Sequence, residues 1–427
     1  MHIVGIIAEY NPFHRGHLSQ FSWIKDKLGP DTRIVVALAS YFCQRGCPGL
    51  QSPRQRAKAA IQAGADLVLL LPQYFSNTAA TCYAQAGVSL LAATGMVRTQ
   101  AASAEIKDKD LIQEAAKLIS PESPELQTAI RQLIREGLSP HQARGTALLQ
   151  LGADPQVVQV FDQANARLCA EYLSARAHLP AGWSKPGFFL CPREEDTLGA
   201  SQLRSMIEAT ALQTQAKKTW QAPWAQEQES KITGPAQLVN FPLISQLAES
   251  MPPESLSLLA QDLSEGNFAL NTSLLTLARL SLSRINRAED LASYRDMQAG
   301  LADRLLANLR DQDYLTAVTA KNFPAGRVTR ALTSYLLGID QNMMGQAGDY
   351  PAYLFPLAFN RDGRYILRKM QERAKLPVFA RFSETAQSQD PAVQAQALVE
   401  RRAAALWAYL ANKPGLEADL LEPPIQL

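Results

Sequence analysis

Short apolar runs alternate with helix-like segments over the first part of the chain. Three of these runs, HIVGIIAEY at 2–10, RIVVALA at 33–39 and DLVLLLP at 66–72, are apolar on both faces of a strand. Between the last two, residues 52–64 carry a Ser cap, a Pro at the first helical position and a closing Gly, which is typical of a helix. Strands that are apolar on both faces belong to parallel sheets covered by helices on both sides. We therefore predict a doubly wound α/β fold in which these three runs are neighbouring parallel strands.

The rest of the chain reads as mostly helical. Helical patterns dominate 107–176, and they are followed by a strand-like run, GFFLC at 187–191, and a helix from about Gln202. The segment 214–232 is polar and irregular, and we interpret it as a linker. The mostly helical pattern beyond it ends in an α/β piece at 352–380. We therefore expect an α/β domain at 1–213, a linker at 214–232 and a mostly helical C-terminal domain at 233–427.

Composition places the chain among ordinary globular proteins. Its 427 residues are 47% hydrophobic and 19% charged, which is enough for two or three domains with their own cores. The longest apolar runs are shorter than a membrane span and no leader pattern is visible, so we expect no membrane partner and a cytoplasmic location. The five scattered cysteines suit a reducing compartment and do not have zinc-site spacing, so no metal site is predicted.

Charge gives a weak indication of a nucleic-acid partner. The net charge is only +2, but residues 271–381 contain 16 Lys and Arg against 10 Asp and Glu. An ordinary solvated helical surface would give the same local excess.

Two histidines lie where the first strand passes into the first helix, in AEYNPFHRGHL at 8–18. His14 and His17 are three residues apart, and so fall on one face of a first helical turn, while Gly16 leaves the backbone open between them. Ligands of doubly wound sheets bind beyond the carboxyl ends of the strands, where helix N-termini attract anions. We predict a phosphate clamp that serves nucleotidyl transfer. The alternative is a pair of surface histidines, one of which caps the helix.

A second phosphate contact is predicted in LGASQLRSM at 198–206. Ser201 stands at a helix start and Arg204 lies in the first turn, so a hydroxyl, backbone amides and a guanidinium could hold phosphate oxygens. The alternative is a capped helix with a solvated arginine.

Several motifs together resemble one family. Three stretches carry the resemblance, in this order along the chain: GIIAEYNPFHRGH, YFCQRGCPGLQSPRQRAKAAIQAGADLVLLLP and KNFPAGRVTRALTSYLLG. In these stretches and in their order, the chain resembles bacterial tRNA(Met) cytidine acetate ligases, which belong to the HxGH nucleotidyltransferase superfamily. The resemblance extends over nearly the whole chain. It implies an enzyme that joins acetate to ATP, giving acetyl-adenylate and pyrophosphate. The acetyl group then passes to the wobble cytidine of elongator tRNA(Met), giving N4-acetylcytidine and AMP.

The resemblance also implies site residues and ligands. ATP, expected together with Mg²⁺, and acetate would be the small-molecule substrates, and elongator tRNA(Met) the partner. Catalysis would rest on His14 and His17, and tRNA contacts on Lys321, Arg327 and Arg330. The ATP site would be formed by Ile7, Ala8, Glu9, Asn11, Phe13, His14, Gly16, His17, Ser103, Asn165, Ser201 and Arg204.

Some positions depart from the pattern of the family. The loop LASYFCQRGCP has Ser40, Tyr41 and Cys47 where the family has a glycine, a polar residue and an acid, and Ser103 stands at a glycine position. Arg193 is a shifted substitute for an arginine expected after the strand at 187–191.

Two other functions therefore stay open. One is an RNA-binding protein in which catalysis has decayed. The other is an adenylyltransferase that acts on another small substrate.

Overall fold

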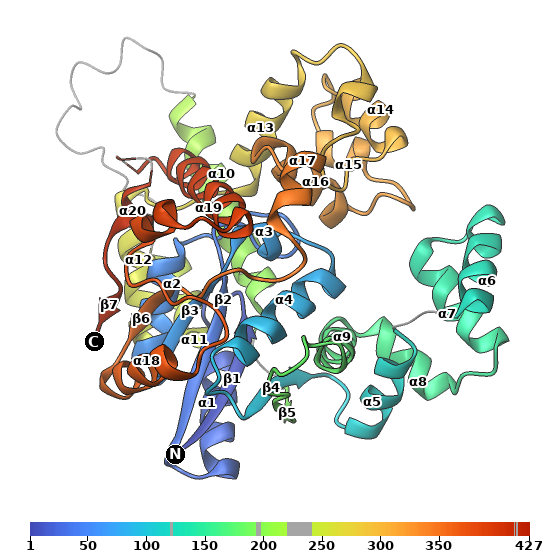
Figure 1. Cartoon of the computed structure of the whole chain (residues 1–427). Helices are drawn as coiled ribbons and strands as arrows, with labels where there is room; N and C mark the ends of the chain where they lie inside the picture. Colours follow the sequence, from blue (N-terminus) through green and yellow to red (C-terminus); the bar gives the residue numbers. More distant parts are fainter. Residues whose placement is uncertain (120–122, 194–197, 220–240, 414, 416) are drawn as a thin grey trace, which may run out of the picture.

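A single sheet organises the molecule, as the computed structural model in Figure 1 shows. The structure describes residues 1–119, 123–193, 198–219, 241–413, 415 and 417–427. Within them, seven strands pair in the order β5-β4-β1-β2-β3-β6-β7. The strands are β1 (His2–Ala8), β2 (Thr32–Ala39), β3 (Leu67–Leu71), β4 (Thr99–Ala104), β5 (Gly187–Pro192), β6 (Pro356–Phe359) and β7 (Ile425–Gln426).

The first five strands are parallel, and β1, β2 and β3 are direct neighbours. This confirms the predicted doubly wound sheet and its three predicted central strands. The strand predicted at 187–191 is also present, as β5. The strand order reverses between β1 and β4, and in sheets of this kind that point forms the ligand crevice.

Close packing of helices on the sheet explains the apolar strands. The two helices that connect the central strands are α1 (Arg15–Leu28) and α2 (Pro53–Gln62), while α4 (Ala80–Ala93) packs against α9 (Ala164–Ala177). An added Cβ at Gly5 would lie 2.8 Å from Leu91 of α4, and one at Gly87 would lie 2.7 Å from Ile7. Glycine at both positions therefore allows α4 to approach β1 closely.

Helices fill the long connection between β4 and β5, as predicted for 107–176. They form the lobe that projects at the right of Figure 1. These are α5 (Lys109–Lys117), α6 (Pro124–Arg135), α7 (Pro140–Gln150) and α8 (Pro155–Gln159), followed by α9. After β5, α10 (Ala200–Thr219) extends into the segment predicted as a linker at 214–232, which lies outside the described residues from position 220.

The C-terminal part is mostly helical and returns to the sheet. β6 pairs antiparallel with β3, and β7 pairs with β6, so this part of the chain completes the sheet. The α/β piece predicted at 352–380 is present as β6 and α18. None of the described helices is both long and apolar enough to cross a membrane. The remaining helices are α3 (Gln73–Ser76), α11 (Phe241–Ser250), α12 (Pro253–Glu265), α13 (Asn271–Leu282), α14 (Ala299–Ala307), α15 (Tyr314–Val318), α16 (Ala325–Leu336), α17 (Gln341–Ala347), α18 (Arg361–Arg373), α19 (Pro391–Leu410) and α20 (Ala418–Leu421).

A buried carboxyl joins the C-terminal part to the strand ends. Glu400 of α19 is fully buried, and it accepts hydrogen bonds from the hydroxyl of Ser40 after β2 and from the backbone N–H of Gln73 after β3, the latter at 2.6 Å. Burial raises the pKa of Glu400 to about 7, although the two hydrogen bonds act in the opposite direction. The folded protein therefore holds this proton more tightly than the unfolded chain does.

Replacing Glu400 by Gln is expected to flatten the pH dependence of stability. Because the folded pKa is raised from 4.5 to about 7, the stabilisation from this carboxyl is complete below pH 4.5 and is lost as pH rises to 7. The loss corresponds to roughly 3 kcal/mol of unfolding free energy. Urea unfolding at acid and at mildly alkaline pH measures it. Glu254→Gln, at an exposed site on α12, is the control, and an identical pH slope in Glu400→Gln and the parent would contradict the assignment.

Candidate active site

The predicted histidines lie at the switch point of the sheet. His14 and His17 begin α1, directly beyond the carboxyl end of β1. Ser103 lies at the carboxyl end of β4, the neighbouring strand across the switch point, and pairs in register with Cys191 of β5. His14, His17 and Ser103, all predicted to contact ATP, thus lie at the same edge of the sheet.

The two imidazoles form a capping box at the start of α1. His14 is the N-cap, and its Nδ1 accepts from the backbone N–H of Gly16 at 3.1 Å. His17 Nδ1 accepts from the backbone N–H of His14 at 3.2 Å, and the ring centroids are 3.8 Å apart. Since each Nδ1 is an acceptor, each neutral ring carries its proton on Nε2. Within the described residues neither Nε2–H has a hydrogen-bond partner, while the Gly16 N–H is already engaged.

Both imidazoles are held neutral. Burial, followed by the positive charge of Arg193, lowers the pKa of His14 to about 4. Burial, His14 and Arg193 lower the pKa of His17 well below its usual range. The histidine proposed to cap the helix in the alternative interpretation is indeed a cap, but this role fixes its tautomer and leaves its outer nitrogen free to donate.

An aromatic cluster supports the histidine pair from beneath. Phe13 is buried, and its ring lies 5.3 Å from the His17 ring, while the Tyr10 ring lies 4.8 Å from it. The Phe13 carbonyl also accepts from Ser255 of α12 at 3.0 Å. Phe13, predicted as an ATP contact, thus packs against His17 and helps to fix its position.

A carboxylate, an amide and a guanidinium converge beside the histidines. Glu105 Oε1 accepts from Asn165 Nδ2 at 2.6 Å and from Arg193 Nη1 at 2.7 Å, and its Oε2 accepts from the Ala166 N–H at 3.0 Å. Burial opposes ionisation, but these hydrogen bonds and the charge of Arg193 lower the pKa of Glu105. Glu105 therefore positions Arg193, and sequence reasoning, which kept Asn165, did not identify this carboxylate.

The other residues predicted from β1 and its following turn serve mainly the scaffold. Ile7 packs against α4 and Ala8 ends the strand. Glu9 Oε1 accepts from the Gln44 N–H at 2.7 Å. Asn11, which is 2% exposed, accepts from the Leu50 N–H at 2.9 Å and donates to the Pro48 carbonyl. Glu9 and Asn11 therefore hold the loop after β2 against the end of β1.

The predicted second phosphate contact is joined to that loop. Ser201 is exposed in the first turn of α10. One turn later, Arg204 donates from Nη1 to the Cys47 sulfur at 2.9 Å. The structure therefore pairs Arg204 with a thiol of the loop after β2, and within the described residues Ser201 has no comparable side-chain contact.

The residues predicted to contact tRNA differ in their surroundings. Arg330 forms an ion pair with Asp296 at 3.2 Å, while Lys321 is exposed and donates to the Gly137 carbonyl. The Arg327 guanidinium lies 5.5 Å from the centre of the Phe323 ring. Of these three, Lys321 and Arg327 have no carboxylate partner in the part of the chain that the structure describes.

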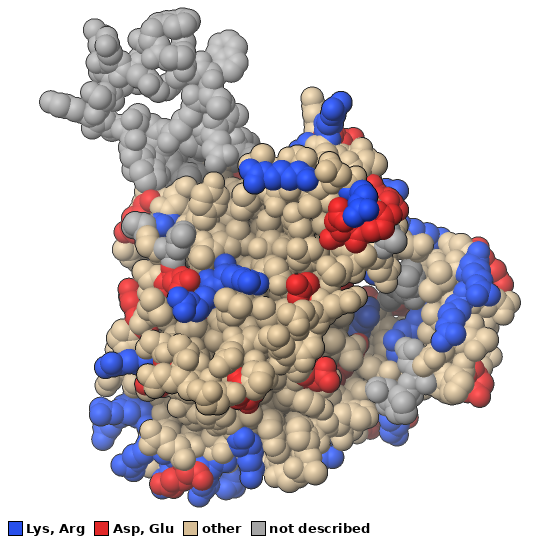
Figure 2. All heavy atoms as spheres, turned by 45° about the horizontal axis from the view of Figure 1, so that its top comes forward, with Lys and Arg blue, Asp and Glu red and all other residues tan. Residues whose placement is uncertain are grey.

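Part of the local basic excess at 271–381 lies on another helix. In Figure 2, Lys and Arg gather near the lower left edge, the region where Figure 1 shows α18. Arg361, Arg364 and Arg368 are exposed on this helix. The helix starts where Phe359 pairs with Leu67, at the amino end of β3 and the sheet edge opposite the histidines. These arginines are therefore not part of the candidate site.

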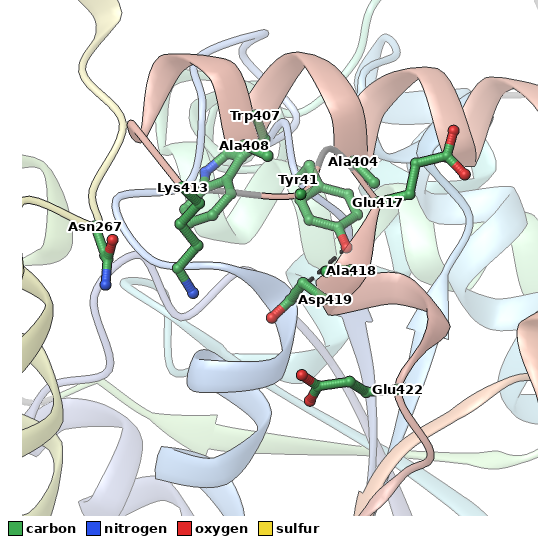
Figure 3. Close-up of a pocket in the computed structure, with 11 residues that line it drawn as sticks. Tyr41, Asn267, Ala404, Trp407, Ala408, Lys413, Glu417, Ala418, Asp419 and Glu422 are labelled. Atoms are coloured by element: carbon green, nitrogen blue, oxygen red, sulfur yellow. Dashed lines mark hydrogen bonds between the residues drawn. The ribbon is translucent and has the colours of Figure 1, made fainter.

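Two departures from the family pattern face the C-terminal helices. Ser40 donates to Glu400, and the Tyr41 hydroxyl donates to Asp419 at 3.3 Å. Figure 3 shows Tyr41 and Asp419 in a separate cavity of about 270 Å³. No residue predicted to bind ATP lines this cavity, whose walls are Tyr41, Asn267, Ala404, Trp407, Ala408, Lys413, Gly415, Glu417, Ala418, Asp419 and Glu422.

Comparison with known proteins identifies the family. A family model described as HIGH Nucleotidyl Transferase matches residues 1–418. The chain belongs to this family. The histidine pair of this HIGH nucleotidyl transferase thus lies at the sheet edge where the sequence analysis predicted nucleotidyl transfer chemistry.

Curated relatives and solved structures extend the likeness over the whole chain. The tRNA(Met) cytidine acetate ligase of Syntrophomonas wolfei is 27% identical over 402 residues, covering 91% of this chain and 89% of that protein. The enzyme of the same name from Clostridium novyi is 24% identical over 393 residues, covering 90% and 91%. A crystal structure of Thermotoga maritima TmcAL bound with alpha-thio ATP matches with a TM-score of 0.82 and 23% identity over 100% of both chains. The resemblance to this ligase family is therefore confirmed.

Removing the charge of Arg193 is expected to raise the pKa of both site imidazoles. Arg193→Gln keeps a hydrogen-bond donor for Glu105 but removes the cation that opposes protonation of His14 and His17. Titration of the histidine signals by NMR should place the His14 pKa above its value of about 4 in the parent. His2, at the amino end of β1, is the internal control. Unchanged titration of both site imidazoles would show that Arg193 does not act on them.

Proposed function

We propose that this protein is an ATP-dependent ligase that acetylates the wobble cytidine of elongator tRNA(Met) with acetate, through an acetyl-adenylate. The observation that carries the proposal is the pair of neutral imidazoles, His14 and His17, whose Nε2–H groups are fixed at the switch point of the sheet. The names of the relatives support the choice of substrates.

The first step needs stabilisation of a leaving pyrophosphate. An acetate oxygen attacks the α-phosphorus of ATP, and the bond to the β-phosphate breaks, so negative charge develops on the departing oxygen. The two Nε2–H donors supply hydrogen bonds to that charge without a prior proton transfer, and Arg193 supplies the positive charge. Because the capping box fixes the donors before ATP binds, little reorganisation is needed during the reaction.

The second step needs access for the base and exclusion of water. The exocyclic amine of cytosine attacks the acetyl carbonyl and AMP leaves, so no covalent intermediate on the protein is required. Water would hydrolyse the adenylate, and the site must therefore close around the base. Lys321 and Arg327 are the proposed contacts to tRNA phosphates, because these two cations have no carboxylate partner among the described residues.

Mg²⁺ would reach the site with the triphosphate. No group of three or more His, Cys, Asp or Glu side chains that could hold a metal occurs within the described residues. Mg²⁺ bound with a nucleotide takes most of its ligands from phosphate oxygens and water, and few from the protein. The acid beside Arg193 in this site is Glu105. These protein side chains are therefore compatible with a Mg²⁺ ion that ATP itself mainly coordinates.

One assay separates the three candidate functions. The purified protein is incubated with ATP, acetate and bulk bacterial tRNA, and the tRNA is digested to nucleosides and analysed by mass. N4-acetylcytidine supports the ligase. ATP turnover that gives a final product without tRNA supports the adenylyltransferase, and tRNA binding without ATP turnover supports the RNA-binding protein.

Removing either imidazole is expected to slow adenylate formation. His14→Ala and His17→Ala should each lower acetate-dependent exchange of pyrophosphate into ATP by roughly a hundredfold, the loss typical of one transition-state donor. ATP affinity should fall less, because the donors act mainly on charge that develops in the transition state. His178→Ala, at the end of α9, is the matched control. A double variant with unchanged exchange would remove both residues from the mechanism.

Restoring glycine at position 103 is expected to improve ATP binding. A side chain at this strand end would crowd the nucleotide, and its removal should gain about 1 kcal/mol, or roughly fivefold in Kd. Calorimetry of Ser103→Gly against the parent measures the gain, and Ser205→Gly on α10 serves as the control. Equal affinities would mean that Ser103, which lies beside Cys191, does not face the nucleotide.

A further inference from the structure

The loop after β2 forms a tight hairpin that brings two cysteines together. Phe42 and Pro48 pair as an antiparallel bridge, and inside it the Cys43 N–H donates to the Cys47 carbonyl at 2.9 Å. The Cys43 carbonyl accepts from the Gly46 N–H at 2.7 Å, which closes the turn. Residues that face each other in antiparallel pairs have Cα atoms about 4.5–5.5 Å apart, within the range that a disulfide spans. The backbone therefore places the two cysteines within the reach of a disulfide.

The hairpin is fixed against α16. Gly46 has a φ of +83°, and an added Cβ would lie 2.5 Å from the backbone nitrogen of Arg330, so glycine is required there. The Gly46 carbonyl accepts from the Thr333 hydroxyl at 2.8 Å. The two cysteines thus lie in a rigid turn.

The two thiols are chemically unlike. The Cys43 thiol is buried and donates a hydrogen bond to Cys47, which lowers the pKa of Cys47; burial opposes this effect and the charge of Arg204 adds to it. The same hydrogen bond, with burial, raises the pKa of Cys43 well above its usual range. Cys47 is partly exposed, so it has the features of an attacking thiolate and Cys43 those of a resolving thiol.

The other three cysteines lack these features. Cys82 is exposed, but burial of its thiol group raises its pKa. Cys169 and Cys191 are buried, and burial raises the pKa of both, that of Cys191 to about 12. Of the five, Cys47 alone has a lowered pKa and a bound guanidinium, since Arg204 donates to its sulfur at 2.9 Å.

We propose that Cys43 and Cys47 are an oxidative modification site, at which a peroxide converts the dithiol to a disulfide and thereby releases Arg204. The Cys47 sulfur attacks one peroxide oxygen, the O–O bond breaks, and the other oxygen leaves as water, which makes Cys47 a sulfenic acid. The Cys43 sulfur then attacks the Cys47 sulfur, the S–O bond breaks and a second water leaves. The two thiols lose two electrons and two protons to one hydrogen peroxide. Arg204 loses the cysteine sulfur to which it donates.

Tryptic peptides of the full-length protein can detect this disulfide directly. Arg45 lies between the two cysteines, so trypsin separates residues 34–45 from 46–54. After treatment of the reduced protein with equimolar hydrogen peroxide, the two peptides should remain joined until a thiol reductant separates them. The pair should react at least about tenfold faster than Cys82. Peptides that separate without reductant, or earlier oxidation of Cys82, would overturn the proposal.

Single variants test the order of the two steps. Cys43→Ser should stop the reaction at the sulfenic acid of Cys47, which dimedone traps in the peptide 46–54. Cys47→Ser should leave Cys43 unreactive at the same peroxide concentration, and Cys82→Ser should form the disulfide as fast as the parent. Equal reactivity of Cys43 in the parent and in Cys47→Ser would contradict the assigned roles.

The release of Arg204 has its own readout, which rests on the proposed function. A free guanidinium must be ordered again when phosphate binds, so ATP affinity measured by calorimetry should fall several-fold on oxidation and return with reductant. A disulfide that leaves ATP affinity unchanged would refute the role of Arg204. A reduced protein that binds no ATP would refute the proposed function and leave the disulfide standing.

Discussion

The buried guanidinium of Arg56 fixes the geometry on which the candidate site depends. This side chain is 1% exposed and donates to three backbone carbonyls: that of Glu9 at 2.6 Å, that of Ser40 at 2.5 Å and that of Gln51 at 3.1 Å. It thus ties the turn after β1, the end of β2 and the start of α2 to one point. Because a buried charge without these acceptors would be costly, the three segments cannot separate without a large loss of stability. The histidine turn and the cysteine hairpin both arise from segments fixed in this way.

Two arginines of the site are held by different kinds of acceptor. Arg193 is paired with the carboxylate of Glu105, and Arg204 with the sulfur of Cys47. The imidazoles of His14 and His17 are neutral, so the positive charge that acts on them comes from the guanidinium of Arg193, whose position is set by Glu105. Peroxide does not oxidise the carboxylate of Glu105, whereas it can oxidise the sulfur of Cys47. Oxidation can therefore break the contact of Arg204 with Cys47, but not the ion pair of Arg193 with Glu105.

The sequence predicted those features that depend on residues next to one another in the chain. The strands β1, β2 and β3 are apolar on both faces, and the histidine pair lies within one turn. β4 reads TQAASA and carries no strand signal of its own; it is a strand because β1 and β5 pair with it on either side. In the same way, the contacts of Glu105 with Asn165 and Arg193, and of Arg204 with Cys47, join segments far apart in the chain. The pattern of neighbouring residues in the sequence does not predict contacts between segments so far apart.

The departures in the loop after β2 become intelligible through the same long-range contacts. A hydroxyl at Ser40 meets the buried carboxyl of Glu400, and the hydroxyl of Tyr41 meets Asp419, both of which come from the C-terminal helices. Replacing either hydroxyl alone would leave a carboxyl group without one of its donors, at a cost of about 1–3 kcal/mol for a buried group. The loop residues and the acids are therefore matched as pairs. Ser40 and Tyr41 bind the loop to α19 and α20 through their side chains, whereas Arg56 holds the backbone near the histidines through main-chain carbonyls, which do not depend on the side chains at positions 40 and 41.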